Sequence, residues 1–150
     1  MNPEYLLIDG KDQIMGRLAA QVAKLALLGK HILVINTKDI VISGEKQSIF
    51  DYYVEKKNKK TRSNPKWGPF FHRIPDKFFR RACRGMLPIK MPHGVDAFKR
   101  IHAAITADYD KDIHRKVVPY QVPNASKERL SHKCVTLEAI ANRFGWRLQV

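Results

Sequence analysis

The first 36 residues constrain the fold more than any other part of the chain. Residues 5–9 (YLLID) are a short apolar run that ends at Gly10, a pattern typical of a β-strand. Residues 31–36 (HILVIN) are a continuous apolar run, typical of a buried strand. A helix is predicted between them, over residues 15–28. A strand, a helix and a strand in so short a span predict a βαβ crossover, which joins parallel strands.

The helix predicted over residues 15–28 is amphipathic. Apolar side chains recur at positions i, i+4, i+7 and i+8, which places them on one face. These residues are Leu18, Val22, Leu25 and Ala26, and the opposite face carries Arg17, Gln21 and Lys24. Gly29 follows the last turn, where a left-handed C-cap favours glycine. The helix therefore has a face to bury against the two strands, and we expect Leu18, Val22 and Ile35 to be buried.

Further elements are predicted with less periodicity, and together they indicate a single α/β domain over residues 1–150. A strand is expected over residues 40–42, followed by a helix that Ser43-Gly44 opens and that runs to about residue 57. Helices are also expected over residues 75–84 and 94–103, and one N-capped by Thr136 and stopped by Gly145. Weak strand signals lie at Ile105, residues 117–118 and the closing residues 146–150.

The positive charge of the chain is concentrated in one segment. Residues 56–100 carry 14 of the 28 Lys and Arg but only two acids, a net charge of +12 out of +14. Aromatic side chains, among them Trp67 and Phe70, are interleaved with these cations. Cations neutralise phosphates, and flat rings stack on unpaired bases. A merely solvated basic face is the alternative, but this density of charge favours a nucleic-acid partner.

Two parts of the basic segment have distinct patterns. Residues 56–75 lack periodicity and contain polar breakers and three prolines, which predicts an extended basic loop that becomes ordered on RNA. In the helix that follows, four cations recur at i, i+3, i+4 and i+7 and form one cationic stripe: Lys77, Arg80, Arg81 and Arg84. Like charges on one helical face repel one another, and a polyanion along them relieves that cost.

The candidate RNA-binding residues fall into three groups. Two predicted helix starts offer backbone N–H groups to phosphate, at Gly16, Arg17, Ser43, Gly44 and Lys46. The loop contributes Lys56, Lys57, Lys59, Lys60, Arg62, Lys66, Trp67, Phe70, His72 and Arg73. The stripe contributes Lys77, Arg80, Arg81 and Arg84, with Lys90 beyond it.

No catalytic or cofactor motif is complete in the sequence. Gly10 and Gly16 flank a strand-to-helix turn, but the Lys-Ser/Thr pair of a phosphate-binding loop is missing, and so is GxGxxG. The six histidines show neither HxxxH nor HExxH spacing, and no GxSxG is present. The alternating acids Asp108, Asp110 and Asp112 lack the glycine and glutamate of a calcium loop and predict a solvated turn. We expect no enzymatic activity, metal or cofactor.

The sequence also indicates in which cellular compartment the protein is located. The chain has no apolar run of about 18 residues, so no membrane-spanning helix is predicted. Its first residues do not match a signal peptide, and Cys83 and Cys134 are distant single thiols. These features predict an intracellular protein.

Four segments of the chain resemble the L-thirteen family of universal large-subunit ribosomal proteins, of the archaeal or eukaryotic cytosolic type. The most specific is Gly85-Met86-Leu87-Pro88 after the basic helix. The others are Ile8-Asp9 with Met15-Gly16-Arg17-Leu18-Ala19, then Val34-Ile35-Asn36 with Ile42-Ser43-Gly44, then residues 67–73 with Pro75. The resemblance spans about residues 5–107.

This resemblance implies a three-layer α/β/α fold around a small, mainly parallel sheet and a structural role without enzymatic activity. Its implied partners are large-subunit rRNA and neighbouring ribosomal proteins, with no membrane or small-molecule substrate. The implied location is on cytoplasmic ribosomes, after nucleolar assembly in a eukaryote. Two other functions stay open from the residues: a regulatory RNA-binding protein outside the ribosome, and a nucleotide-utilising enzyme built on the βαβ unit.

Overall fold

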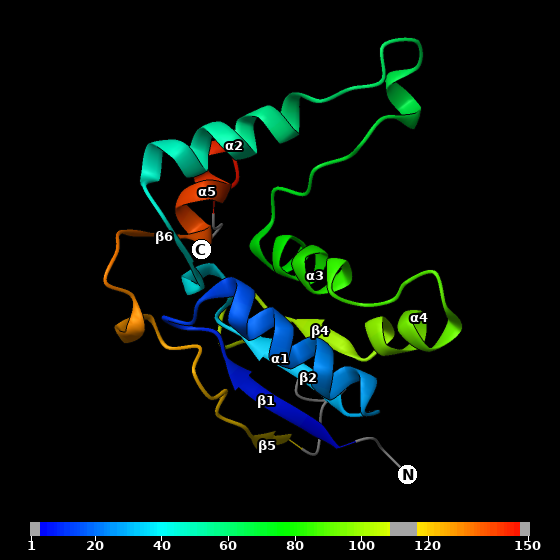
Figure 1. Ribbon diagram of the computed structural model, residues 1–150, viewed down its shortest axis with the longest axis vertical. Helices are drawn as coiled ribbons and strands as arrows, with labels where there is room; N and C mark the ends of the chain where they lie inside the picture. Colours follow the sequence, from blue (N-terminus) through cyan, green and yellow to red (C-terminus); the bar gives the residue numbers. More distant parts are fainter. Residues whose placement is uncertain (1–3, 109–116, 148–150) are drawn as a thin grey trace.

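The predicted βαβ unit is present in the computed structural model, which describes residues 4–108 and 117–147. Strand β1 (Tyr5–Asp9), helix α1 (Met15–Leu27) and strand β2 (His31–Ile35) follow one another along the chain. The two strands are parallel, with Ile8 opposite Val34. Helix α1 lies across them, as Figure 1 shows. The periodicity of the first 36 residues therefore predicted this unit correctly.

Four parallel strands form the main sheet, in the order β4-β2-β1-β5. Strand β4 (Ile101–Ala103) pairs with β2, and β5 (Val117–Pro119) pairs with β1. A second, two-stranded sheet is antiparallel and joins β3 (Val41–Ser43) to β6 (Cys134–Thr136). The α/β class with a mainly parallel sheet is thereby confirmed.

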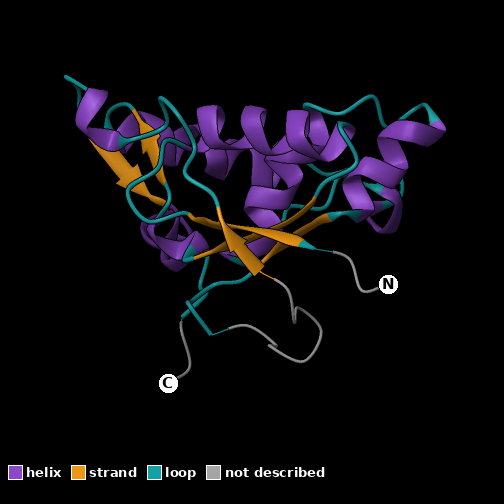
Figure 2. Ribbon diagram, turned by 90° about the horizontal axis from the view of Figure 1, so that it is seen from below, coloured by secondary structure: helices purple, strands orange, loops and turns teal. Residues whose placement is uncertain are grey.

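The remaining helices flank the sheets. They are α2 (Lys46–Asn58), α3 (Pro75–Gly85), α4 (Pro92–Lys99) and α5 (Leu137–Arg143), with single 3-10 turns at η1 (Thr37–Asp39), η2 (Pro65–Trp67) and η3 (Lys127–Arg129). Figure 2 shows most of the helical ribbon on one side of the four-stranded sheet. The predicted N-cap of α5 is present, because the Thr136 hydroxyl accepts a hydrogen bond from the backbone N–H of Ala139.

The hydrophobic core lies between α1, α3 and the main sheet. Leu18 and Val22 of α1 are fully buried, as predicted, and they pack in one cluster with Ile8, Ile32 and Phe79. Ile35, the last residue of β2, is only half-buried, because it lies at the end of the strand opposite the exposed Asp9. The core thus belongs to the N-terminal βαβ unit and to the apolar face of α3.

Several predicted boundaries differ from those in the structure. The helix expected over residues 94–103 ends at Lys99, because the next residues form strand β4, which adds to the edge of the sheet where Ile101 is buried opposite Ile32. That strand replaces the one expected at Ile105. Helix α2 begins at Lys46 rather than at Ser43-Gly44, since Ser43 is still paired in β3. Residues 146–147 are not in a strand, and the rest of that expected strand lies outside the described residues.

The basic segment occupies one side of this framework. Helix α2 leads into an irregular connection, residues 59–74, which returns to α3. This connection, called the arm below, projects away from the body of the molecule in Figure 1. The predicted loop therefore starts about three residues later than expected, because Lys56 and Lys57 belong to the last turn of α2.

Candidate nucleic-acid interface

The tip of the arm is a closed turn. Within it, the Asn64 side chain accepts a hydrogen bond from the backbone N–H of Lys66, and the N–H groups of Trp67 and Gly68 donate to the carbonyls of Asn64 and Pro65. The two sides of the turn touch, because a Cβ atom on Gly68 would lie 2.9 Å from the backbone nitrogen of Thr61. Glycine at this position allows that approach.

The base of the arm is anchored in a cluster of aromatic rings. The Phe71 ring centroid lies 5.3 Å from that of Phe144, 5.5 Å from Phe78 and 6.0 Å from Tyr53. Tyr53 belongs to α2, Phe78 to α3, and Phe144 is the C-cap residue of α5. The sequence predicts a loop that becomes ordered on RNA, and it does not predict this anchor. The adjacent Phe70-Phe71 pair was the available signal, since two neighbouring rings in a polar segment are unusual for a disordered loop.

Two aromatic rings of the arm are open to solvent. Trp67 is 83% exposed and Phe70 is 64% exposed. Other rings beside the basic segment are covered by cations of the protein itself: Lys56 lies 4.2 Å from the Tyr52 centroid, and Arg80 lies 5.0 Å from that of Phe98. Trp67 and Phe70 therefore have faces available for stacking.

The cationic stripe on α3 has the predicted orientation. Phe78, Phe79 and Cys83 are buried on the opposite face, while Lys77, Arg81 and Arg84 are exposed and Arg80 is half-buried. Within residues 4–108 and 117–147, no carboxylate forms an ion pair with any of the four stripe cations; pairs elsewhere include Lys59–Glu55 and Lys99–Asp96. The stripe thus carries charge that the described part of the protein does not neutralise.

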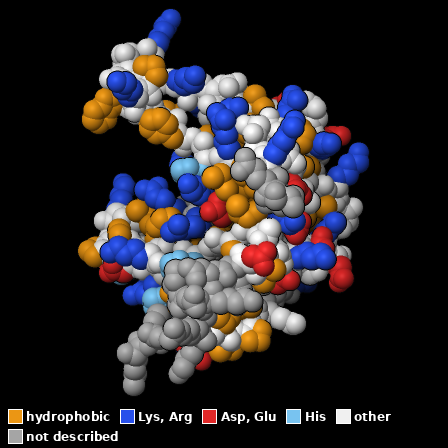
Figure 3. Space-filling view, turned by 180° about the vertical axis from the view of Figure 1, so that it is seen from behind, with side chains coloured by type: hydrophobic (Ala, Val, Ile, Leu, Met, Phe, Trp, Pro, Cys, Tyr) orange, Lys and Arg blue, Asp and Glu red, His pale blue; other side chains and the backbone are white. Residues whose placement is uncertain are grey.

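Lys90 extends the cationic surface beyond the stripe. It is exposed in the turn between α3 and α4 and lines a shallow hollow together with Arg84. Gly94 makes that turn possible, since a Cβ atom there would clash with the Pro88 carbonyl. Figure 3 shows Lys and Arg side chains gathered on the arm and on both sides of the notch beneath it.

The two predicted helix starts differ in the groups that they leave available. Gly16 and Arg17 are exposed in the first turn of α1, where the Arg17 guanidinium donates to the Asn124 carbonyl at 3.3 Å. Gly44 cannot offer its N–H to phosphate, because that group donates to the Lys133 carbonyl at 2.8 Å. Ser43, Gly44 and Lys46 also lie at the far end of α2, about 20 Å from the arm along a helix of 13 residues.

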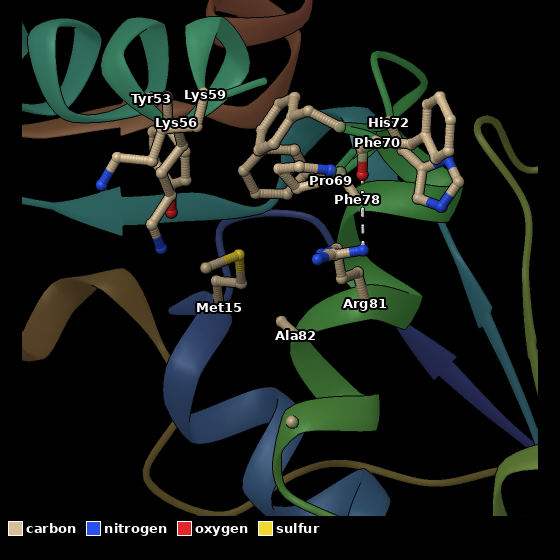
Figure 4. A pocket seen from close by; sticks show the side chains of 12 residues that line it. Met15, Tyr53, Lys56, Lys59, Pro69, Phe70, His72, Phe78, Arg81 and Ala82 are labelled. Atoms are coloured by element: carbon tan, nitrogen blue, oxygen red, sulfur yellow. Dashed lines mark hydrogen bonds between the residues drawn. The ribbon is translucent and has the colours of Figure 1, made fainter. Parts of the chain in front are cut away.

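A groove of about 420 Å³ runs between α2, the base of the arm and α3. Its polar lining residues, all of them exposed, are Lys56, Lys59, His72 and Arg81. The rest of the lining is largely apolar and consists of Met15, Tyr53, Pro69, Phe70, Phe71, Phe78, Ala82 and Gly85. The Arg81 guanidinium lies 3.5 Å from the Phe70 carbonyl, a contact drawn as a dashed line in Figure 4. Sequence reasoning did not find the groove, since its walls are far apart along the chain.

Two features of the described residues bear on catalysis and metal binding. Burial raises the pKa of the Cys83 thiol to about 12, so this thiol is not a nucleophile at neutral pH. Among residues 4–108 and 117–147, no group of three or more His, Cys, Asp or Glu could hold a metal ion. Within the same ranges, no helix is long and apolar enough to cross a membrane. Of the predicted acidic turn, Asp110 and Asp112 lie outside the described residues.

Comparison with known proteins identifies close relatives. The model of the family Ribosomal protein L13 matches residues 3–106. The large ribosomal subunit protein uL13 of Methanopyrus kandleri is 40% identical over 147 residues, which cover 97% of this chain and 89% of that protein. The uL13 protein of Methanocaldococcus jannaschii is 36% identical over 93% of this chain and 96% of its own length. That of Caenorhabditis elegans is 35% identical over 96% of this chain and 71% of its own length.

Proposed function

Because the chain belongs to the ribosomal protein L13 family, we propose that it is a structural component of the large ribosomal subunit that binds folded large-subunit rRNA. The RNA-binding surface consists of the arm (residues 59–74), the adjoining end of α2 and the cationic stripe of α3. The observation that carries this proposal is the α3 stripe, whose four cations have no carboxylate partner among residues 4–108 and 117–147, together with the two exposed rings of the arm. An enzyme that uses nucleotides finds no comparable support.

The stripe and the arm have different roles in this proposal. The buried face of α3 packs against α1, so the stripe is held on a rigid helix before RNA arrives. A preorganised row of cations recognises the spacing of phosphates rather than the sequence of bases. Trp67 at the tip of the arm and Phe70 near its base are both exposed, so unpaired bases can stack on them.

Membership of the family suggests the partners and the location of the protein. Neighbouring large-subunit proteins are the expected protein partners, and the expected location is the cytoplasmic ribosome, with nucleolar assembly if the source is eukaryotic. Members of the family are structural proteins, so no reaction is assigned to this chain. Ser43, Gly44 and Lys46 lie apart from the arm and would contact a second RNA segment.

Sedimentation of the endogenous protein tests the proposal. We expect it to co-sediment with large subunits through a sucrose gradient and to resist a moderate salt wash, because many phosphate contacts are made at once. Recovery chiefly in the soluble fraction would contradict a ribosomal role and would favour a regulatory RNA-binding protein outside the ribosome.

A further inference from the structure

The groove between α2, the base of the arm and α3 has the properties of a site for one nucleotide. We propose that it binds a single unstacked RNA base, which stacks on Phe70 while the adjoining phosphate lies at Arg81 and Lys56. The proposal rests on the proposed function, since it names the part of the RNA that this surface takes.

The size and lining of the groove fit that occupant. Its volume of about 420 Å³ lies within the roughly 300–1,000 Å³ typical of small-molecule sites. The lining includes three cations and no carboxylate and is otherwise largely apolar; of the cations, Lys59 pairs with Glu55, which leaves Lys56 and Arg81 for an anion. A nucleotide has the matching distribution, with an anionic phosphate outside and a flat base inside. A paired base is not available to such a site, because it is stacked within its helix.

The interior of the groove is held open by ring contacts. Tyr53 and Phe78 meet edge to face at a centroid distance of 5.0 Å, and Phe71 and Phe78 do so at 5.5 Å. These arrangements are favourable for aromatic pairs and tie α2, the arm and α3 together. With Phe71 fixed in the cluster, the neighbouring Phe70 stays exposed at the groove. The site therefore exists before RNA binds and needs little reorganisation.

Few polar groups are available to read the base. Burial, with a contribution from neighbouring Tyr52, raises the pKa of the Tyr53 phenol, so this group stays protonated and can donate a hydrogen bond. Among residues 4–108 and 117–147, no hydrogen-bond partner of that hydroxyl is found. Figure 4 shows Tyr53 and Phe70 on opposite sides of the groove. One phenol and the exposed imidazole of His72 give little discrimination, so the site should accept any base, as stacking platforms do.

Two oligonucleotides separate base binding from phosphate binding. The full-length protein is titrated into a fluorescent five-nucleotide adenosine RNA and into the same RNA with an abasic central nucleotide. Both carry the same phosphates, so a difference in affinity reports the base. We expect the intact RNA to bind about 10-fold more tightly, in line with the usual contribution of one stacked base.

Variants then locate the base. Phe70→Ala should abolish the preference for the intact RNA, and Phe70→Trp should retain it. Arg81→Gln should weaken both RNAs by the same factor. Leu28→Ala is the matched control, because Leu28 is similarly exposed, at 69%, on a different part of the molecule, and should change neither affinity.

Three results would overturn the groove as a base site. They are equal affinity for the two RNAs, a preference that survives Phe70→Ala, and a preference that is lost on Trp67→Ala but not on Phe70→Ala. The last would place the base at the arm tip, and the first would fit a groove that receives a protein segment. Any of them leaves co-sedimentation with large subunits intact, so failure of the groove site is distinguishable from failure of the ribosomal role.

Discussion

The βαβ core and the basic surface formed by the arm and α3 differ in how they treat apolar and charged side chains. The core buries apolar side chains such as Leu18 and Val22, while charges elsewhere on the molecule find partners, as in Lys127–Asp12 and Lys133–Glu45. The arm and α3 instead carry many exposed cations, and among residues 4–108 and 117–147 the four stripe cations have no carboxylate partner, although Lys59 at the start of the arm pairs with Glu55. The difference indicates that the core supplies most of the free energy that stabilises the fold. The cations of the basic surface therefore do not need carboxylate partners within the protein and are available to an external polyanion.

The most severe test of this division places a charge in the core. Val22→Asp should prevent folding, because an unpaired carboxylate at a fully buried position costs several kcal/mol. Ala20→Asp, on the exposed side of the same helix, is the matched control and should fold. Circular dichroism and thermal melts of both variants make the comparison. A cooperative transition in Val22→Asp near the wild-type temperature would contradict the assignment of the core to α1.

The converse test removes charge from the surface. If about eight phosphates are neutralised, binding to an rRNA fragment should fall with the logarithm of salt at a slope of about −6 to −7. Replacing Lys77, Arg81 and Arg84 by Gln should flatten the slope by about two units without lowering the melting temperature. Lys24→Gln with Lys30→Gln is the control, since both lysines are exposed outside the basic segment. An unchanged slope in the triple variant would make the stripe a solvated face.

Phe71 joins the arm to the core, so its removal tests how much the anchored base of the arm contributes to stability. Phe71→Ala should lower the free energy of unfolding by about 2 kcal/mol, less than for a fully buried ring, because Phe71 is half-buried. Chemical denaturation measures this loss. A variant as stable as the wild type would show that the arm is not anchored to the core.

The arm tip should behave in the opposite way to its base. Replacing residues 62–67 by two glycines keeps the contact between Thr61 and Gly68 and should leave the melting temperature almost unchanged. The same variant should be impaired in incorporation into large subunits, measured by competition with the wild-type protein during assembly. Normal incorporation would remove Arg62, Lys66 and Trp67 from the RNA-binding surface.

Local patterns predicted much of this molecule, and contacts between distant segments explain the rest. The period of α1 and the i, i+3, i+4, i+7 spacing of the stripe depend only on helix geometry, so both could be derived from the sequence. The helix predicted over residues 94–103 wrongly includes residues 101–103, because their strand conformation depends on pairing with β2, nearly 70 positions earlier. The groove and the Phe71 anchor depend on α2, α3 and α5 meeting, which no local pattern specifies.

The smallest expected effect separates two adjacent arginines of the stripe. Arg80 is half-buried with its guanidinium over the Phe98 ring of α4, whereas Arg81 is exposed beside the groove. Loss of such a cation–π contact costs about 0.5–1 kcal/mol. Arg80→Gln should therefore lower the free energy of unfolding by that amount, and Arg81→Gln should leave it unchanged while weakening RNA binding more. Denaturation and binding titrations on the two single variants check this. If both arginines affected only RNA binding, Arg80 would belong wholly to the surface, and the link between α3 and α4 would have to come from apolar packing alone.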